Sequence, residues 1–305
     1  MLTSCRILLL ALTLTLCGCA TTYNPATEQR EFIFVTTAME ESIGSVVAGN
    51  VSTQYKISKD SQKIDRVNEI GRKVASVSDR RDLKYKFSVI EDEDLNAFTT
   101  PGGYIYINSG VLAKASDDEL ACVIGHEIGH VAARHIAKKL QAQIGYDILM
   151  NIAASRAGPG DLQRAASVSF NLIMLGYSRQ DESLSDRLGV KYAYKAGYDP
   201  YAMITFLEKL KTAEKKSLGP VFLRSHPYVS ERIKMMQLAL PAITDKVDKK
   251  TSEADVVRTQ KQESVNTLAP VVAKEKRPLK VMCPVCRRLF SGKTRYCPYD
   301  GTKLD

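Results

Sequence analysis

Apolar residues recur at helical spacing through much of the chain. In the stretch from about Glu28 to Val77, Ile64, Val67, Ile70 and Val74 fall three or four residues apart, as they would on one face of a helix. We therefore expect this stretch to be mostly helical.

Two shorter segments alternate between apolar and polar residues instead. The alternation in YKFSVI (85–90) and in GYIYIN (103–108) predicts two strands, the second with Ile105 and Ile107 on one face. Many helices beside one small sheet predict an α+β fold that is mostly helical.

Helical spacing returns in the second half of the chain. It predicts helices at 163–175 and 179–195. Asp199–Pro200 suits the start of another helix, because aspartate caps a helix and proline fits its first turn. Ser230 caps a last helix, which we expect to stop before Pro241.

The central helix has the clearest start signal. Ser116 and Glu119 form a capping box, which predicts a helix over 117–141. Gly125 and Gly129 lie inside it, although each costs about 1 kcal/mol relative to alanine in a helix interior. Close approach of another element to that face would account for both glycines.

The N-terminus predicts export. A basic residue, an apolar stretch (7–16) and a small-residue junction indicate that residues 1–18 are a signal peptide, and the apolar run is too short to span a bilayer. Leu16–Cys19 resembles the bacterial lipobox, in which the cysteine is acylated and becomes the new N-terminus; an ordinary signal peptide is the alternative. Ala20, by resemblance to Gram-negative lipoproteins, favours the periplasmic face of the outer membrane. A polar tether should follow.

Composition sets the domain limits. The 305 residues are 44% hydrophobic and contain no tryptophan, which suits one sizeable domain at 19–241 with an appendage. Residues 242–280 are rich in Lys, Glu, Asp, Thr and Gln, so we expect a flexible charged linker there.

Much of the net charge of +9 lies in the C-terminal tail, where residues 241–305 hold 14 Lys plus Arg and 8 Asp plus Glu. The tail has no aromatic-interleaved basic patch, and an exported protein does not meet nucleic acid. We therefore expect no nucleic-acid partner, and an anionic membrane surface is the better match for this charge.

The segment HEIGH carries the chemistry. His126 and His130 are four residues apart, so on a helix they lie one turn above each other and can bind one zinc ion. Glu127 would lie beside the metal, where it can take a proton from bound water. A hydrolytic zinc site needs a third protein ligand and one open position for water.

His135 does not fit as that third ligand. In the metzincin pattern a histidine stands at the position of Ile136 and a glycine at that of Ala133. His135 is one residue out of register and lies about 140° around a continuous helix from His130. We expect it either at the surface or in support of a ligand.

Two acidic residues on the helix at 179–195 are better candidates. Glu182 and Asp186 are four residues apart on one face. Glu182 can complete the zinc triad, while Asp186 can accept the ring N–H of a ligating histidine and hold its tautomer. Without HEIGH, two solvated acids would be the simpler interpretation.

Three segments carry a family resemblance. HEIGHVAARH, YSRQDESLSDRLGVKYAYKAGYDP and SHPYVSERI resemble the gluzincin metallopeptidase family of the CAAX prenyl protease and HtpX, and most of all its periplasmic lipoprotein members of the LoiP and BepA type. The resemblance covers about 24–240. It implies a zincin-like zinc endopeptidase with Glu182 as ligand, Asp186 as its support, and Arg179 and Arg232 in supporting positions. Ser185 replaces a usual alanine and leaves the ligand spacing intact.

The resemblance also assigns residues that would meet substrate. Asn96 and Ala97, with the turn at Gly102 and Gly103, match a strand that pairs with substrate backbone; a core hairpin is the alternative. His226 should face the metal. It could donate to the oxyanion of the reaction, or bind zinc as an inhibitory fourth ligand.

The C-terminal unit, 281–305, has its own cysteine pattern. Cys283, Cys286 and Cys297, with Asp300 in the fourth position, resemble a short zinc ribbon with one structural zinc ion. A disulfide with one thiol left over is the alternative in an oxidising compartment. We favour zinc, because two Cys-Pro turns separated by ten residues match the ribbon pattern and so short a unit needs a staple to fold. We expect the unit to dock an unidentified protein.

The sequence is compatible with three functions. The first is a lipid-anchored zinc endopeptidase that cleaves unfolded or misfolded proteins of the bacterial envelope. The second is a chaperone or assembly lipoprotein that binds extended segments without cutting, and the third is a scaffold in which the C-terminal unit is the working part. An intact Glu127 favours the first.

Overall fold

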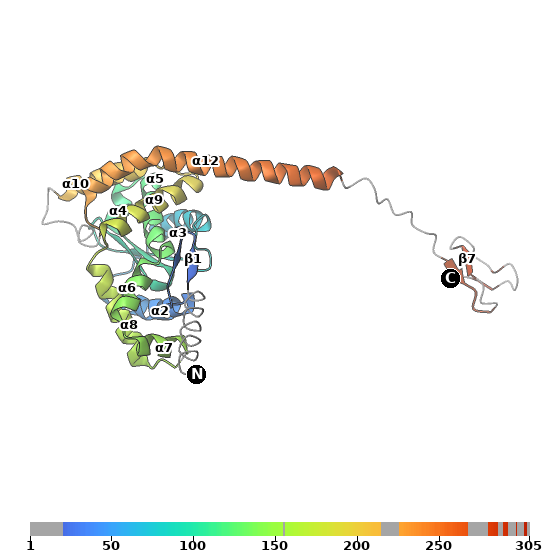
Figure 1. The fold of residues 1–305 in the computed structure, drawn as a ribbon, viewed down its shortest axis with the longest axis horizontal. Coiled ribbons are helices and arrows are strands. Elements are labelled where there is room, and N and C mark those ends of the chain that lie inside the picture. The colour runs from blue at the N-terminus through green and yellow to red at the C-terminus, as the bar shows by residue number, and fades with distance from the viewer. Residues whose placement is uncertain are drawn as a thin grey trace, which may run out of the picture. The chain divides into compact units, whose positions relative to one another are not determined.

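The computed structural model describes residues 21–154, 156–214 and 226–267, and, near the C-terminus, 280–285, 289–291, 297 and 302–303. The chain divides into two compact units, residues 1–249 and 250–305. The predicted signal peptide, Cys19, Cys286 and Asp300 lie outside the described residues. The larger unit contains the peptidase-like segments, and Figure 1 shows its small sheet surrounded by helices.

The sheet of the larger unit has three strands in the order β3-β5-β4. β3 (Lys86–Ile90) runs parallel to β5 (Tyr104–Asn108), and these are the two predicted strands. β4 (Ala97–Thr100) was expected only from the family resemblance at Asn96 and Ala97 and not from periodicity, because all four of its residues are buried and AFTT does not alternate. The turn at Pro101–Gly103 joins β4 to β5, and its Gly102 has φ 76°, a conformation that favours glycine.

The sheet separates two hydrophobic cores. Ile105 and Ile107 of β5 lie in a core shared with helices α3 (Ser61–Ser76), α5 (Asp117–Ala132) and α9 (Arg179–Lys195). Tyr106 points the other way, because successive side chains alternate across a strand. It packs on Phe98 with ring centroids 5.0 Å apart, in a core built with helices α2 (Thr37–Gln54) and α8 (Pro159–Met174).

The two glycines of the central helix meet a neighbouring helix, as expected. A Cβ at Gly125 would lie 2.6 Å from the carbonyl oxygen of Gly189, and one at Gly129 would lie 2.9 Å from that of Ser185. Only glycine allows α5 and α9 to approach this closely, which sets the spacing between their side chains.

The central helix is shorter than predicted. It ends at Ala132 rather than near Gln141, and α6 (His135–Gln143) begins after Arg134, which has φ 58°. The Arg134 guanidinium forms an ion pair of 2.7 Å with the buried carboxylate of Glu40, which also pairs with Arg80 at 2.7 Å. These partners come from distant parts of the chain, so periodicity alone could not show the break.

The stretch expected as a polar tether followed by mostly helical chain also contains a β-hairpin. A hairpin of β1 (Thr22–Asn24) and β2 (Gln29–Glu31) precedes α2 and α3. The Asn24 amide donates to the carbonyl of Ala132 at 3.3 Å, which fastens the hairpin to the end of α5.

The last helix, α12 (Val229–Thr267), passes through Pro241 instead of stopping before it. Leu240 and Val247 are buried on either side of the proline, so packing of an apolar face continues the helix through the weakened position. The part of the predicted linker up to Thr267 is therefore helical. The remaining helices are α4 (Ser109–Lys114), α7 (Tyr146–Ala153) and α10 (Ala202–Glu214).

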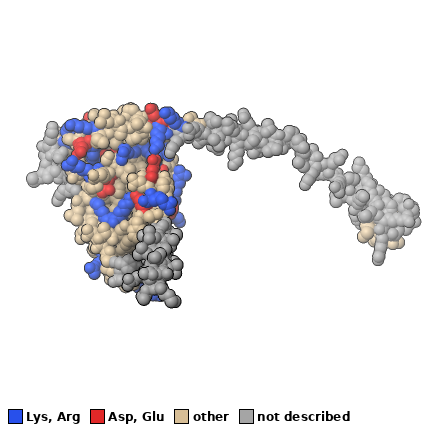
Figure 2. All heavy atoms as spheres, in the orientation of Figure 1, with Lys and Arg blue, Asp and Glu red and all other residues tan. Residues whose placement is uncertain are grey.

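Across the described residues, every helix is too short or too polar to cross a bilayer. Acidic and basic side chains are interspersed over the face of the larger unit seen in Figure 2. In the smaller unit, β6 (Lys280–Met282) pairs with β7 (Leu289–Ser291), and Cys283 and Cys297 are buried.

Candidate metal centre

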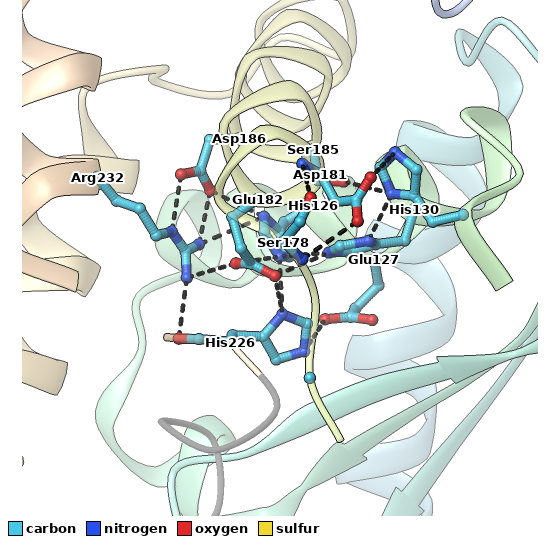
Figure 3. Close-up of polar contacts among 12 residues, drawn as sticks. His126, Glu127, His130, Ser178, Asp181, Glu182, Ser185, Asp186, His226 and Arg232 are labelled. Atoms are coloured by element: carbon cyan, nitrogen blue, oxygen red, sulfur yellow. Dashed lines mark hydrogen bonds and ion pairs between the residues drawn. The ribbon is translucent and has the colours of Figure 1, made fainter. Parts of the chain in front are cut away.

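Three elements bring the candidate zinc ligands together. α5 supplies His126 and His130, α9 supplies Glu182, and the segment before α12 supplies His226 (Figure 3). All four side chains are buried. Among the described residues these four side chains could bind one metal ion together, because their donor atoms all lie within 4.8 Å of one another.

The distances between the donor atoms fit a tetrahedral ion. His126 Nε2 lies 3.1 Å from His130 Nε2 and 3.2 Å from His226 Nδ1. Glu182 Oε1 lies 3.0 Å from His226 Nδ1 and 3.4 Å from His130 Nε2. Zinc–ligand bonds of about 2.0–2.1 Å in a tetrahedron require ligand atoms roughly 3.3–3.4 Å apart. The donor set therefore fits zinc, with His226 in the fourth position.

Asp186 holds the ring of His126. Its Oδ1 lies 2.8 Å from His126 Nδ1, which leaves Nε2 directed at the other ligands. Arg232 donates to both oxygens of Asp186, at 2.6 and 2.8 Å, and forms an ion pair of 2.8 Å with Glu182. Burial alone would raise the pKa of Asp186, but Arg232 and the bond to His126 outweigh it and lower that pKa.

His135 is buried and contacts His130. It therefore supports a candidate ligand and does not lie at the surface. The two Nδ1 atoms are 2.8 Å apart, and His135 Nε2 lies 3.4 Å from the carboxylate of Asp181. The left-handed conformation at Arg134 breaks the helix between the two histidines, so the angle expected on a continuous helix does not apply. Burial lowers the pKa of His130, which favours the neutral imidazole that binds metal.

Glu127 lies beside the ligand cluster and points toward His226 (Figure 3). Its Oε1 is 3.5 Å from His226 Nε2, and neither carboxylate oxygen has a hydrogen-bond partner within the described part of the chain. Burial raises the pKa of Glu127, because the charged form loses its solvation. A buried carboxyl with a raised pKa suits a group that first takes and then returns a proton.

Tyr177 is part of the site and was not singled out from the sequence. Its ring stacks on His130 with centroids 3.7 Å apart, and Lys139 lies over the same ring at 4.4 Å. The one local signal is its place directly before Ser178, the cap of α9, which fixes it close to Glu182.

The expected substrate segment reaches the centre only in part. Thr99, Thr100 and Gly102 line a cavity of about 20 Å³ together with His130. Asn96, Ala97 and Gly103 do not line it. β4 itself is an edge strand that pairs on one side with β5 and packs against α5, so the core-hairpin interpretation and the substrate-strand interpretation are both compatible with its position.

A larger groove adjoins the ligand Glu182. It has a volume of about 330 Å³ between α9 and the start of α12 and is lined by Glu182, Asp186 and Arg232 together with Arg179 and Tyr228. Arg179 lies over the Tyr228 ring at 4.5 Å. The two arginines named as supporting residues therefore differ, because Arg232 is buried against the ligands and Arg179 lines the groove.

Comparison with known proteins agrees with this geometry. The model of peptidase family M48 matches residues 61–239. The β-barrel assembly-enhancing protease of Escherichia coli K12 is 32% identical over 180 residues, which is 55% of this chain and 37% of that protein. The mitochondrial metalloendopeptidase OMA1 of Schizosaccharomyces pombe is 30% identical over 177 residues, 57% of this chain and 52% of OMA1. The metalloprotease LoiP of Escherichia coli K12 is 29% identical over 175 residues, 56% of this chain and 68% of LoiP.

Proposed function

We propose that this chain, which belongs to peptidase family M48 and is a metallopeptidase, is a zinc endopeptidase anchored by lipid on Cys19 at the periplasmic face of the outer membrane. Its substrates would be unfolded or misfolded proteins of the bacterial envelope. The observation that carries the activity is the buried donor set of His126, His130 and Glu182 with Glu127 beside it. The similarity to a protease named for enhancing β-barrel assembly supports the location, because bacterial β-barrels span the outer membrane.

The chemistry divides between the metal and the protein. Zinc, when bound, polarises the scissile carbonyl and lowers the pKa of a water molecule. Glu127 takes the proton of that water and passes it to the leaving amine; both of its oxygens are available, since neither has a hydrogen-bond partner among the described residues. Asp186 and Arg232 keep His126 in the tautomer that binds metal.

His226 would have two roles in two positions. In Figure 3 its Nδ1 lies against His126 and Glu182, where it would bind the ion as a fourth ligand and exclude the attacking water. We propose that this position holds the enzyme inactive. When the segment moves and substrate enters, the same imidazole would donate a hydrogen bond to the oxyanion. Glu182 and Glu127 outweigh burial and raise the pKa of His226, which supports a donor role.

Extended polypeptide is the substrate class that fits best. β4 is an edge strand next to α5. A substrate strand added there would pair through backbone groups, which requires an extended chain but no particular sequence. Unfolded chains meet this requirement and folded ones do not. Asn96, Ala97, Gly102 and Gly103 remain our proposed substrate-contacting residues at this edge.

For the smaller unit we propose a structural zinc ion held by Cys283, Cys286, Cys297 and Asp300. The burial of Cys283, directly after β6, and of Cys297 supports this, because ligands of a closed site lie inside the unit that they staple. Docking of another protein is its proposed use. Zinc content of the whole chain and of a chain without residues 281–305 would differ by one ion per molecule; equal content would leave the disulfide alternative.

Cleavage of casein by the purified protein tests the peptidase. The Glu127→Gln variant should keep its zinc and lose roughly 10²–10⁴-fold in rate, because only the proton-transfer group is removed. A chaperone that does not cut would show equal residual cleavage in both proteins. Acylation is tested separately by the mass of the membrane-extracted protein and by its loss in a Cys19→Ser variant.

A further inference from the structure

The N-terminal hairpin of β1 and β2 is fixed to the body of the enzyme. Asn24 donates to the carbonyl of Ala132 at 3.3 Å, and Ala26 is buried in the core of the larger unit. Glu31 forms an ion pair of 2.6 Å with Lys138 of α6. The hairpin therefore cannot swing away from α5 and α6 without breaking buried contacts.

This rigidity leaves almost no tether to the proposed lipid anchor. Thr21 is the second residue after Cys19, and two extended residues reach at most about 7 Å. If Cys19 carries acyl chains in a bilayer, the hairpin must lie against the surface of that bilayer.

The outward side of the hairpin has the chemistry of a membrane interface. Tyr23 and Arg30 pair across the two strands, on the side opposite the buried Asn24. Tyr23 is 54% exposed, and Phe32, which directly follows β2, is 57% exposed. Arg30 donates to the carbonyl and hydroxyl of Thr21 at 3.2 Å, so its guanidinium lies where the chain leaves for the anchor.

Single exposed aromatic residues need no special explanation. Here, however, two of them lie beside an arginine and close to the acylation site. Aromatic rings favour the boundary between headgroups and acyl chains, and a guanidinium binds phosphate.

We propose that Tyr23, Arg30 and Phe32, the hairpin face, rest on the phospholipid bilayer that holds the acyl chains of Cys19. The inference depends on the proposed acylation. It has a consequence for activity, because Asn24 bonds to Ala132, two residues after the ligand His130. The metal centre would be held at a fixed height above the membrane, and substrate would be cut close to that surface.

The absence of tryptophan from the chain provides a clean probe. A Phe32→Trp variant, prepared as the mature lipoprotein, would be reconstituted in vesicles of phosphatidylethanolamine and phosphatidylglycerol. Its emission would be measured with and without bromine on the acyl chains. Interfacial side chains reach about 5–10 Å into the boundary of headgroups and acyl chains, so quenching by bromine near the glycerol end reports contact.

Tyr201→Trp is the matched control. Tyr201 is 51% exposed but lies near the opposite end of α5, because the neighbouring Asp199 N–H donates to Asp118 at 3.0 Å. The 16 residues of α5 separate the two ends by about 24 Å. A tryptophan there should remain unquenched in the same vesicles.

The expected result is a blue shift and loss of emission for Phe32→Trp and neither for Tyr201→Trp. Adding Tyr23→Ser and Arg30→Ser to Phe32→Trp should weaken the quenching, while unchanged casein cleavage would show that the fold is intact. Equal, unquenched emission from both probes in protein that floats with the vesicles would overturn the docking face and leave the anchor standing. Protein that does not float, and whose mass shows no acyl chains, would instead overturn the proposed anchor and the inference that depends on it.

Discussion

Asp186→Asn tests how the protein supports its metal. Asp186 is fully buried and accepts three contacts, one from His126 Nδ1 at 2.8 Å and two from Arg232 at 2.6 and 2.8 Å. Asparagine has nearly the same shape, but it carries no charge and replaces one acceptor oxygen with an N–H₂ donor. That donor would face either an imidazole N–H or a guanidinium, so one contact must be lost.

The expected effect has two parts. Loss of a residue that orients a metal ligand lowers metal affinity by roughly ten- to a hundredfold, equivalent to about 1.4–2.7 kcal/mol. Breaking one partner of a buried ion pair costs about 3–5 kcal/mol of folding stability. Because Arg232 keeps its ion pair of 2.8 Å with Glu182, the stability loss should fall near the lower end of that range.

The measurements are the zinc dissociation constant, from competition with a chelator of known affinity, and the free energy of unfolding of the metal-free protein. Asp79→Asn is the matched control, since Asp79 accepts from Lys191 at 2.6 Å and from Tyr192 at 2.9 Å, away from the ligands. Both variants should lose stability, and only Asp186→Asn should lose zinc affinity. An unchanged dissociation constant for Asp186→Asn, or an equal loss in both, would refute the supporting role.

Three further predictions concern packing, pH and the fourth ligand. Gly125→Ala should destabilise the protein by about 1–3 kcal/mol in thermal unfolding, because the new methyl group meets α9. Gly49→Ala is the control: it lies in open space on α2 and should stabilise the protein by up to about 1 kcal/mol. A stability change of the same sign in both variants would contradict the packing argument. Burial would raise the pKa of Glu119, but its bonds with Lys209 and the Ser116 backbone lower it below the ordinary glutamate value of 4.5, so this stabilisation is present above pH 4.5 and is lost as the pH falls through the lowered pKa. Glu119→Gln should therefore lose less unfolding free energy than wild type on acidification, and parallel pH curves would argue against it. His226→Ala should lower kcat by roughly 10²–10³-fold through loss of the oxyanion donor, and unchanged kinetics would contradict both proposed roles of that residue.

Local sequence signals located the parts of the site that depend on spacing within one helix. The capping box at Ser116 fixed where α5 begins, and the four-residue spacings placed His126 above His130 and Glu182 above Asp186. The glycines at 125 and 129 pointed to a close neighbour without identifying it. Such signals succeed because each involves residues within one or two helical turns.

The features that periodicity missed depend on partners far along the chain. α5 ends where Arg134 turns toward Glu40, more than ninety residues earlier, and α12 passes Pro241 because Leu240 and Val247 are buried around it. β4 is buried on both faces and so shows no alternation. Tyr177 reaches His130 only once α9 has packed on α5, so no spacing rule could assign it.

The charges of the buried cluster favour a divalent cation at the site. Glu182 and Asp186 have lowered pKa values, because Arg232 and the neighbouring histidines outweigh burial, so both are charged at neutral pH. Arg232 balances only one of them, and Glu127 adds a further negative charge whenever it is ready to accept a proton. A buried, uncompensated carboxylate is costly. One divalent cation held by these ligands would offset the remaining negative charge and would join α5, α9 and the segment before α12.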